Sequence, residues 1–132
     1  MRLSEKQSDF LWMVNDLLNW IGLMKDMFDR DKIYLRVTSW TRTPIEQKLL
    51  FENGATKTLN SKHLSGLAVD LLLMKDGFPI DNSPVYRLMG EYWERIGGRW
   101  GGRWKMPNGD WDVYHFEYNE KRRRDAKKDQ NS

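Results

Sequence analysis

Apolar side chains recur at steps of three and four positions in three parts of the chain, and this spacing predicts three amphipathic helices. A capping box of Ser4 and Gln7 marks the start of the first helix. Serine or threonine followed by proline opens the other two, and a glycine follows each of their ends. We interpret the apolar stripes as core-forming faces, with a partner-binding face as the alternative for the first. The predicted helices span about residues 5–28, 43–53 and 84–96.

Runs of β-branched, aromatic and aliphatic residues between these helices predict strands. The runs cover residues 33–38, 67–74 and 113–118, and the second of them is the most apolar stretch of the chain, which predicts a central strand. Asp76-Gly77 predicts a tight hairpin turn into residues 78–80. The expected fold class is therefore α+β, with a small, mainly antiparallel sheet packed against about three helices.

The positive charge of the chain lies at its C-terminal end. Residues 121–132 hold six Lys/Arg against two Asp, while residues 1–120 carry a slight negative charge within a total of +3. We expect one domain over residues 1–120 and a basic tail over residues 121–132. Such a tail favours an anionic partner, such as nucleic acid, lipid headgroups or a wall polymer; the alternative, which we favour, is a solvated, frayed terminus. The near-neutral body lacks the broad basic face of a nucleic-acid-binding protein, so we expect no nucleic-acid partner.

The composition limits the kind of protein and the kinds of metal ligand that this chain can have. The hydrophobic content of 39% is that of a globular chain. The sequence contains no stretch of about 18 apolar residues, so we expect no transmembrane segment. The N-terminal residues lack the apolar segment of a signal peptide, so we expect synthesis to leave the protein in the cytoplasm. Because there is no cysteine, any metal must be bound by histidine and carboxylate.

The chain has two histidines, and each lies near a carboxylate in a segment of predicted turn and strand. Side chains alternate along a strand, so Asp70 and His115 can project side by side if their strands are neighbours. His63 would approach from the turn before, where Gly66 allows a tight reversal. Two imidazoles and one carboxylate are a usual ligand set for catalytic zinc. We therefore predict that His63, Asp70 and His115 bind one zinc ion and that Asp112 acts on its water.

A doubled Gly-Gly-Arg-Trp segment occupies residues 97–104. Two copies of four residues are too short for a repeat architecture, so we expect tight turns at the glycines. Trp100, Trp104 and Trp111 are interpreted as aromatic core, with a groove for a glycan or peptide as the alternative.

The pattern Ser-x-His-x-x-Gly-x-Ala-x-Asp at residues 61–70, followed by Asp-x-x-His-Phe-Glu at residues 112–117, resembles a family of zinc peptidases that cut peptidoglycan stem peptides. The family includes D-Ala-D-Ala carboxypeptidases and the L-alanyl-D-glutamate endopeptidases of phage endolysins, and its fold is shared with hedgehog signalling domains. The resemblance implies zinc ligands at His63, Asp70 and His115. It also implies a general base at Asp112, where the endolysins have Asp and the carboxypeptidases usually have Glu.

The resemblance implies roles for further residues. The Arg-x-x-x-x-Gln element of the family matches Arg42 and Gln47, and Ser61 matches a serine that contacts substrate in some members. Arg42 would stabilise the oxyanion, with a surface arginine as the alternative. Glu117 would orient a ligand histidine, with a simple hydrogen bond at the edge of the core as the alternative. Before Arg42 the family often has Gly-Tyr, whereas this chain has Trp40-Thr41, so the neighbouring subsite differs.

The function that this resemblance implies is a phage-type endolysin, a zinc-dependent L-alanyl-D-glutamate endopeptidase that acts on peptidoglycan stem peptides. The alternatives are a D-Ala-D-Ala carboxypeptidase with the same zinc site and a non-catalytic binding module of the same fold. We expect a monomer that stays in the host cytoplasm before lysis and then acts on peptidoglycan in the periplasm. Its basic tail would contact anionic polymers of the envelope.

Overall fold

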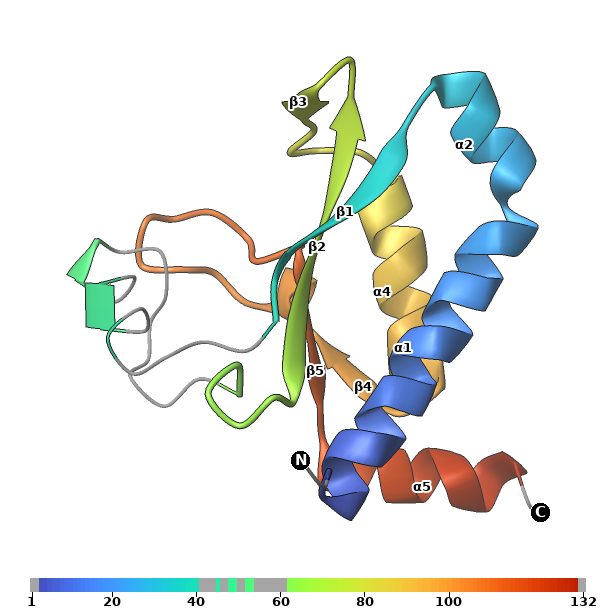
Figure 1. The fold of residues 1–132 in the computed structure, drawn as a ribbon, viewed down its shortest axis with the longest axis vertical. Helices are drawn as coiled ribbons and strands as arrows, with labels where there is room; N and C mark the ends of the chain where they lie inside the picture. Colours follow the sequence, from blue (N-terminus) through green and yellow to red (C-terminus); the bar gives the residue numbers. More distant parts are fainter. Residues whose placement is uncertain (1–2, 41–44, 46–47, 50–51, 54–61, 131–132) are drawn as a thin grey trace.

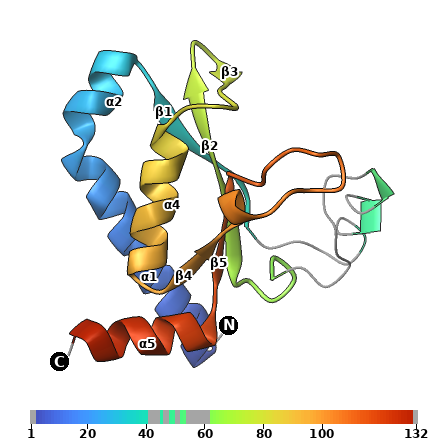
Figure 2. The ribbon, with the colours of Figure 1, turned by 180° about the vertical axis from the view of Figure 1, so that it is seen from behind.

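The computed structural model describes residues 3–40, 45, 48–49, 52–53 and 62–130. It contains one antiparallel sheet of five strands, with the order β1-β2-β5-β4 and with β3 paired to β2. Helices α1 (Glu5–Leu23) and α4 (Val85–Arg95) lie on one side of this sheet in both views (Figures 1 and 2). The predicted α+β class with an antiparallel sheet is confirmed. The strands are β1 (Tyr34–Ser39), β2 (Ala68–Lys75), β3 (Phe78–Pro79), β4 (Gly98–Trp100) and β5 (His115–Tyr118).

The first predicted helix forms, but it is divided into α1 (Glu5–Leu23) and α2 (Lys25–Asp31). The predicted capping box is present, since Ser4 and Gln7 exchange side-chain to backbone hydrogen bonds. At Met24 the backbone N–H donates to Ile21 O, three residues back, so the regular helical pattern is broken there. The poor helix former Gly22 lies in the same turn.

The apolar stripe of α1 is core, as predicted. Phe10, Met13 and Leu17 are completely buried and pack with Leu71 and Leu73 of β2 in one cluster. Helix α4 (Val85–Arg95) adds Met89 and Trp93 to this cluster. Since Leu71 and Leu73 point towards the helices, alternation places Asp70 on the opposite face of the sheet.

The turn between β2 and β3 is the predicted hairpin. Asp76 and Gly77 both have positive φ angles, 53° and 82°, as a two-residue turn of this kind requires. Of the second predicted helix, residues 45, 48–49 and 52 are helical. Its start signals, Thr43 and Pro44, lie outside the described residues.

Two elements differ from the sequence prediction. In the doubled glycine segment, where turns were expected at the glycines, Gly101–Arg103 form a 3-10 turn, but Gly98–Trp100 form strand β4. The basic tail forms helix α5 (Glu120–Gln130) rather than a frayed terminus. Its Arg123 is buried and bonds to Asp9 of α1 and to the carbonyl of Ile96, which fixes the helix to the body. Within the described residues, no helix combines the length and the apolar content that a membrane crossing needs.

Candidate metal centre

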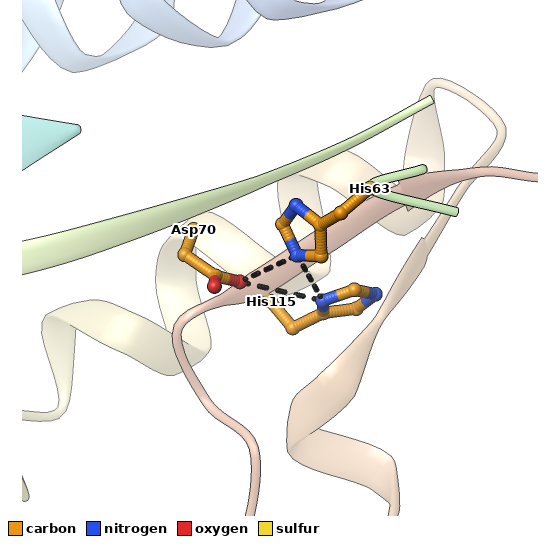
Figure 3. A group of neighbouring side chains, drawn as sticks. All are labelled: His63, Asp70 and His115. Atoms are coloured by element: carbon orange, nitrogen blue, oxygen red, sulfur yellow. Dashed lines mark hydrogen bonds and ion pairs between the residues drawn. The ribbon is translucent and has the colours of Figure 1, made fainter. Parts of the chain in front are cut away.

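Three side chains from separate parts of the chain meet on the sheet face that is turned away from α1 and α4. Asp70 lies in β2 and pairs in register with His115, the first residue of β5, which confirms that the two project side by side. His63 lies in the turn before β2, where Gly66 has the predicted positive φ angle of 70°. Figure 3 shows the two imidazoles and the carboxylate pointing toward one another.

The distances between the inner atoms of these side chains are those of a tetrahedral zinc site. His63 Nε2 lies 3.2 Å from His115 Nδ1, and both nitrogens lie 3.3 Å from Asp70 Oδ1. Zinc with tetrahedral bonds of about 2.0–2.2 Å holds its ligand atoms roughly 3.3–3.6 Å apart. The three side chains therefore fit a single zinc ion without rearrangement.

The outer nitrogen of each imidazole is held by an oxygen atom. His63 Nδ1 donates to the backbone carbonyl of Trp40 at 2.7 Å, and His115 Nε2 donates to Glu117 Oε1 at 2.7 Å. A carbonyl or carboxylate oxygen can only accept, so these contacts keep the outer nitrogens protonated and turn the inner nitrogen of each ring toward Asp70, where it has a lone pair for a metal ion when the ring is neutral. Such outer hydrogen bonds are typical of metal-binding histidines.

The charges around His115 favour a cation at this position. Burial alone would lower the pKa of His115, but Asp70, Glu117 and Asp112 raise it to about 9. Burial alone would raise the pKa of Asp70, yet its hydrogen bonds with His115 and His63 hold it well below the ordinary range. Since metal ions compete with protons for such groups, a site that attracts a proton this strongly also suits a divalent cation.

Asp112 and Glu117 flank the cluster in different ways. Asp112 Oδ2 lies 4.0 Å from His115 Nδ1, on the inner side of the ring. Glu117 lies on the outer side and is buried, and its hydrogen bond with His115 lowers its pKa against the effect of burial. Asp112 therefore stands on the side where a water molecule or substrate would meet the cluster, whereas Glu117 makes the hydrogen bond that its predicted orienting role needs. Both roles remain predictions.

The structure leaves three predicted residues untested and adds three contacts. Arg42, Gln47 and Ser61 lie outside the described residues, and their roles remain predictions. The Trp40 carbonyl and Arg99, whose Nη1 lies 3.9 Å from Glu117 Oε2, were not expected at the site. Trp104, for which a groove was weighed as the alternative to the core, contacts the His115 ring at 5.6 Å between centroids. A backbone carbonyl leaves no sequence signal, and Arg99 lies in the doubled segment, where the sequence predicted turns.

The three tryptophans have different positions. Trp100 is buried in the core, as predicted, and its indole N–H donates to Val113 O. Trp104 is half-buried beside His115. Trp111 is exposed, so the interpretation as aromatic core is wrong for it.

Residues 54–118 match the model of a family described as D-alanyl-D-alanine carboxypeptidase. The match includes both sequence motifs and all the clustered side chains. A search of curated proteins gave no match.

Two peptidases are among the solved structures that are similar to this chain. The L-Ala D-Glu endopeptidase ChiX of Serratia marcescens is 27% identical with a TM-score of 0.50, over 67% of this chain and 69% of ChiX. A mutant of the vancomycin-resistance D,D-pentapeptidase VanY from a VanB-type resistance cassette, in complex with Zn(II), is 20% identical with a TM-score of 0.51. That likeness covers 99% of this chain and 79% of VanY and supports the fold.

Proposed function

We propose that this chain, which belongs to the zinc peptidase family of D-alanyl-D-alanine carboxypeptidases and L-alanyl-D-glutamate endopeptidases, is a phage-type endolysin that cuts between L-Ala and D-Glu in peptidoglycan. The enzyme is a zinc-dependent peptidoglycan peptidase, and the endolysin role and the scissile bond are the parts we propose. The convergence of His63, Asp70 and His115 beside Asp112 carries the proposal.

The residues of the cluster divide the work of peptide hydrolysis. His63 Nε2, Asp70 Oδ1 and His115 Nδ1 would hold the zinc ion, and Trp40 O and Glu117 accept hydrogen bonds from the outer nitrogens of the two rings. When bound, zinc lowers the pKa of a water molecule and polarises a carbonyl group. The Asp112 carboxylate takes a proton from the attacking water and delivers it to the amine nitrogen of the leaving residue. The peptide bond breaks, and a carboxylate and a free amine are the products.

Two observations support endopeptidase rather than carboxypeptidase activity. The similar structure with the higher identity, at 27%, is that of an L-Ala D-Glu endopeptidase. Asp112 also stands where the phage endolysins have Asp. The family description favours the second candidate, a D-Ala-D-Ala carboxypeptidase.

Mass spectrometry of digested peptidoglycan separates these two activities. An endopeptidase of the proposed type creates new D-Glu amino termini, whereas a carboxypeptidase releases free D-Ala. We expect the first set of products. Release of D-Ala without new D-Glu termini would establish the second activity.

The proposed endolysin role also has a cellular test. The enzyme would accumulate in the cytoplasm of the host without harm until the membrane is opened, and it would then lyse the wall. Expression in bacteria followed by membrane permeabilisation should give rapid lysis, while expression with the Asp112→Asn variant should not. Lysis that is equally fast with both would contradict the role.

Helix α5 presents a basic surface suited to an anionic wall or envelope polymer. Lys121, Arg122, Arg124 and Lys128 are exposed on it, whereas Arg123 is turned inward. We propose that the exposed cations concentrate the enzyme on the envelope by charge attraction. Deleting the helix is a poor test, because it would also remove Arg123 from the core.

The sharper test neutralises charge and keeps Arg123. A triple variant, Arg122→Gln, Arg124→Gln and Lys128→Gln, should slow lysis of whole cells several-fold and leave cleavage of soluble stem peptides within about twofold. The control changes three exposed cations elsewhere, Lys25, Arg30 and Arg87, to Gln. The proposal for this surface would be wrong if the α5 variant lost equal rates of whole-cell lysis and of peptide cleavage. It would also be wrong if the control variant lost as much whole-cell lysis as the α5 variant.

A further inference from the structure

The two copies of the doubled segment form a pair of crossed contacts. The Arg99 guanidinium lies over the Trp104 ring, 4.7 Å from its centroid, and the Arg103 guanidinium lies over the Trp100 ring at 5.3 Å. Each arginine thus stacks on the tryptophan of the other copy, in the geometry of a cation–π contact.

The two contacts face different parts of the molecule. Arg103 makes two hydrogen bonds to Glu94 of α4, at 3.1 and 2.8 Å, and stacks on Trp100, a core residue. This contact joins β4 and the turn after it to α4. Its partners, Trp100 and Glu94, are not among the candidate metal ligands.

The Arg99–Trp104 pair instead lies next to the groups on both sides of His115, a candidate zinc ligand. Arg99 is the cross-strand partner of Glu117, and its Nη1 lies 3.9 Å from Glu117 Oε2. Trp104 meets the His115 ring edge-on, at 5.6 Å between centroids. Glu117 in turn holds His115 Nε2 at 2.7 Å. One arginine therefore contacts both of the groups that fix the orientation of this ring.

We propose that Arg99 and Trp104 are positioning residues for the zinc ligand His115. The guanidinium restrains the Glu117 carboxylate on one side, and the indole that it covers restrains the imidazole on the other. The orientation of His115 Nδ1 toward His63 and Asp70 depends on both. This inference rests on the zinc site of the proposed function and is independent of which peptide bond is cut.

The two arginines provide a matched pair for the test. Their side chains are 49% and 48% exposed, and each stacks on a tryptophan and faces a glutamate. Methionine at either position keeps a straight apolar chain over the indole and removes the charge and the donors. We compare Arg99→Met with Arg103→Met by zinc competition against a chromogenic chelator, together with thermal unfolding of the metal-free protein.

Arg99→Met should weaken zinc binding about tenfold, the lower end of what an outer contact of a metal ligand contributes. Arg99→Lys should recover most of the loss, because it restores a cation beside Glu117. Arg103→Met should lower the unfolding temperature and leave the zinc dissociation constant unchanged. Trp104→Leu should also weaken zinc binding and shift the visible absorption of the cobalt-substituted protein.

A double-mutant cycle tests whether Arg99 acts through Glu117. If it does, Arg99→Met combined with Glu117→Gln should bind zinc little more weakly than Glu117→Gln alone. Unchanged zinc affinity in Arg99→Met, an equal loss in Arg103→Met, or full additivity in the cycle would overturn the inference. Failure of the wild type to bind zinc would instead overturn the metal site itself.

Discussion

His63 Nε2 and His115 Nδ1 lie 3.2 Å apart, and each of these nitrogens lies 3.3 Å from Asp70 Oδ1. The other nitrogen of each ring donates a hydrogen bond, His63 Nδ1 to Trp40 O and His115 Nε2 to Glu117, and these two bonds keep Nε2 and Nδ1 facing each other. A divalent cation between them would be bound by both nitrogens and by the Asp70 carboxylate. The geometry of this pair therefore suits a shared metal ion.

Loss of either histidine should remove the metal. His63→Ala and His115→Ala each take away one of three protein ligands, and we expect zinc affinity to fall on the order of a hundredfold or more. Metal analysis after dialysis measures the zinc that remains, and a chelator should abolish wild-type activity until zinc is restored. Asp81→Asn, which changes a carboxylate bonded to Tyr114, is the control. Stoichiometric zinc in either histidine variant would refute the ligand set.

Asp112→Asn should separate catalysis from metal binding. The amide keeps the shape of the side chain but cannot accept the proton of the attacking water, so kcat should fall by about 10²–10⁴. Zinc content should stay stoichiometric, because Asp112 Oδ2 stands 4.0 Å from His115 Nδ1 and outside the three-residue ligand cluster. If zinc were lost together with activity, Asp112 would be a ligand rather than a base.

The parts of this site that the sequence predicts are those governed by local rules. Asp70 and His115 meet because side chains alternate along strands and because β2 and β5 are neighbours. The reversal at Gly66 follows from the conformational freedom of glycine. Tertiary contacts decide the rest: β4 has only three residues and exists because β5 pairs with it. Helix α5 has no apolar stripe from which the sequence could have predicted it. An ion pair between Arg123 and Asp9 fixes it to the body instead.

Gly101 should be intolerant of any side chain. A Cβ at this position would overlap the backbone oxygen of Asp112 and lie 2.8 Å from His115 Cβ, so the turn must move away from the site. Displacement of a catalytic group by about 1 Å can cost on the order of a hundredfold in rate, and we expect a loss of that size in kcat/KM for Gly101→Ala.

Gly22→Ala is the matched control for this substitution. A Cβ at Gly22 meets nothing within 4 Å, and the residue lies in α1. Activity should be unchanged and stability slightly higher, because alanine is the better helix former. Equal activity of the Gly101 and Gly22 variants would show that the close approach at Gly101 is not needed for catalysis.

The ion pair that holds α5 should make stability depend on pH. Burial alone would raise the pKa of Asp9, but hydrogen bonds from Arg123, Lys127 and Tyr118 lower it below the ordinary value of 3.8. The unfolded chain then binds more protons than the folded one in this range, so the stabilisation is complete above about pH 4 and is lost as pH falls through the folded pKa. At pH 7, Asp9→Asn should lower the free energy of unfolding by about 2 kcal/mol, because Arg123 keeps its burial but loses its charged partner.

Urea unfolding of the wild type and of Asp9→Asn at pH 7 and at pH 3 measures this dependence. The difference in unfolding free energy between the two proteins should be largest at pH 7. It should shrink at pH 3, where the Asp9 carboxylate of the wild type begins to be protonated and to lose the charge that the variant lacks at every pH. Asp26→Asn, at an exposed position of α2, controls for the general loss of a carboxylate. A difference that stayed constant across this range would mean that the charge of Asp9 does not stabilise the fold. Helix α5 would then be held by contacts of Arg123 other than its ion pair with Asp9, such as its hydrogen bond to Ile96 O.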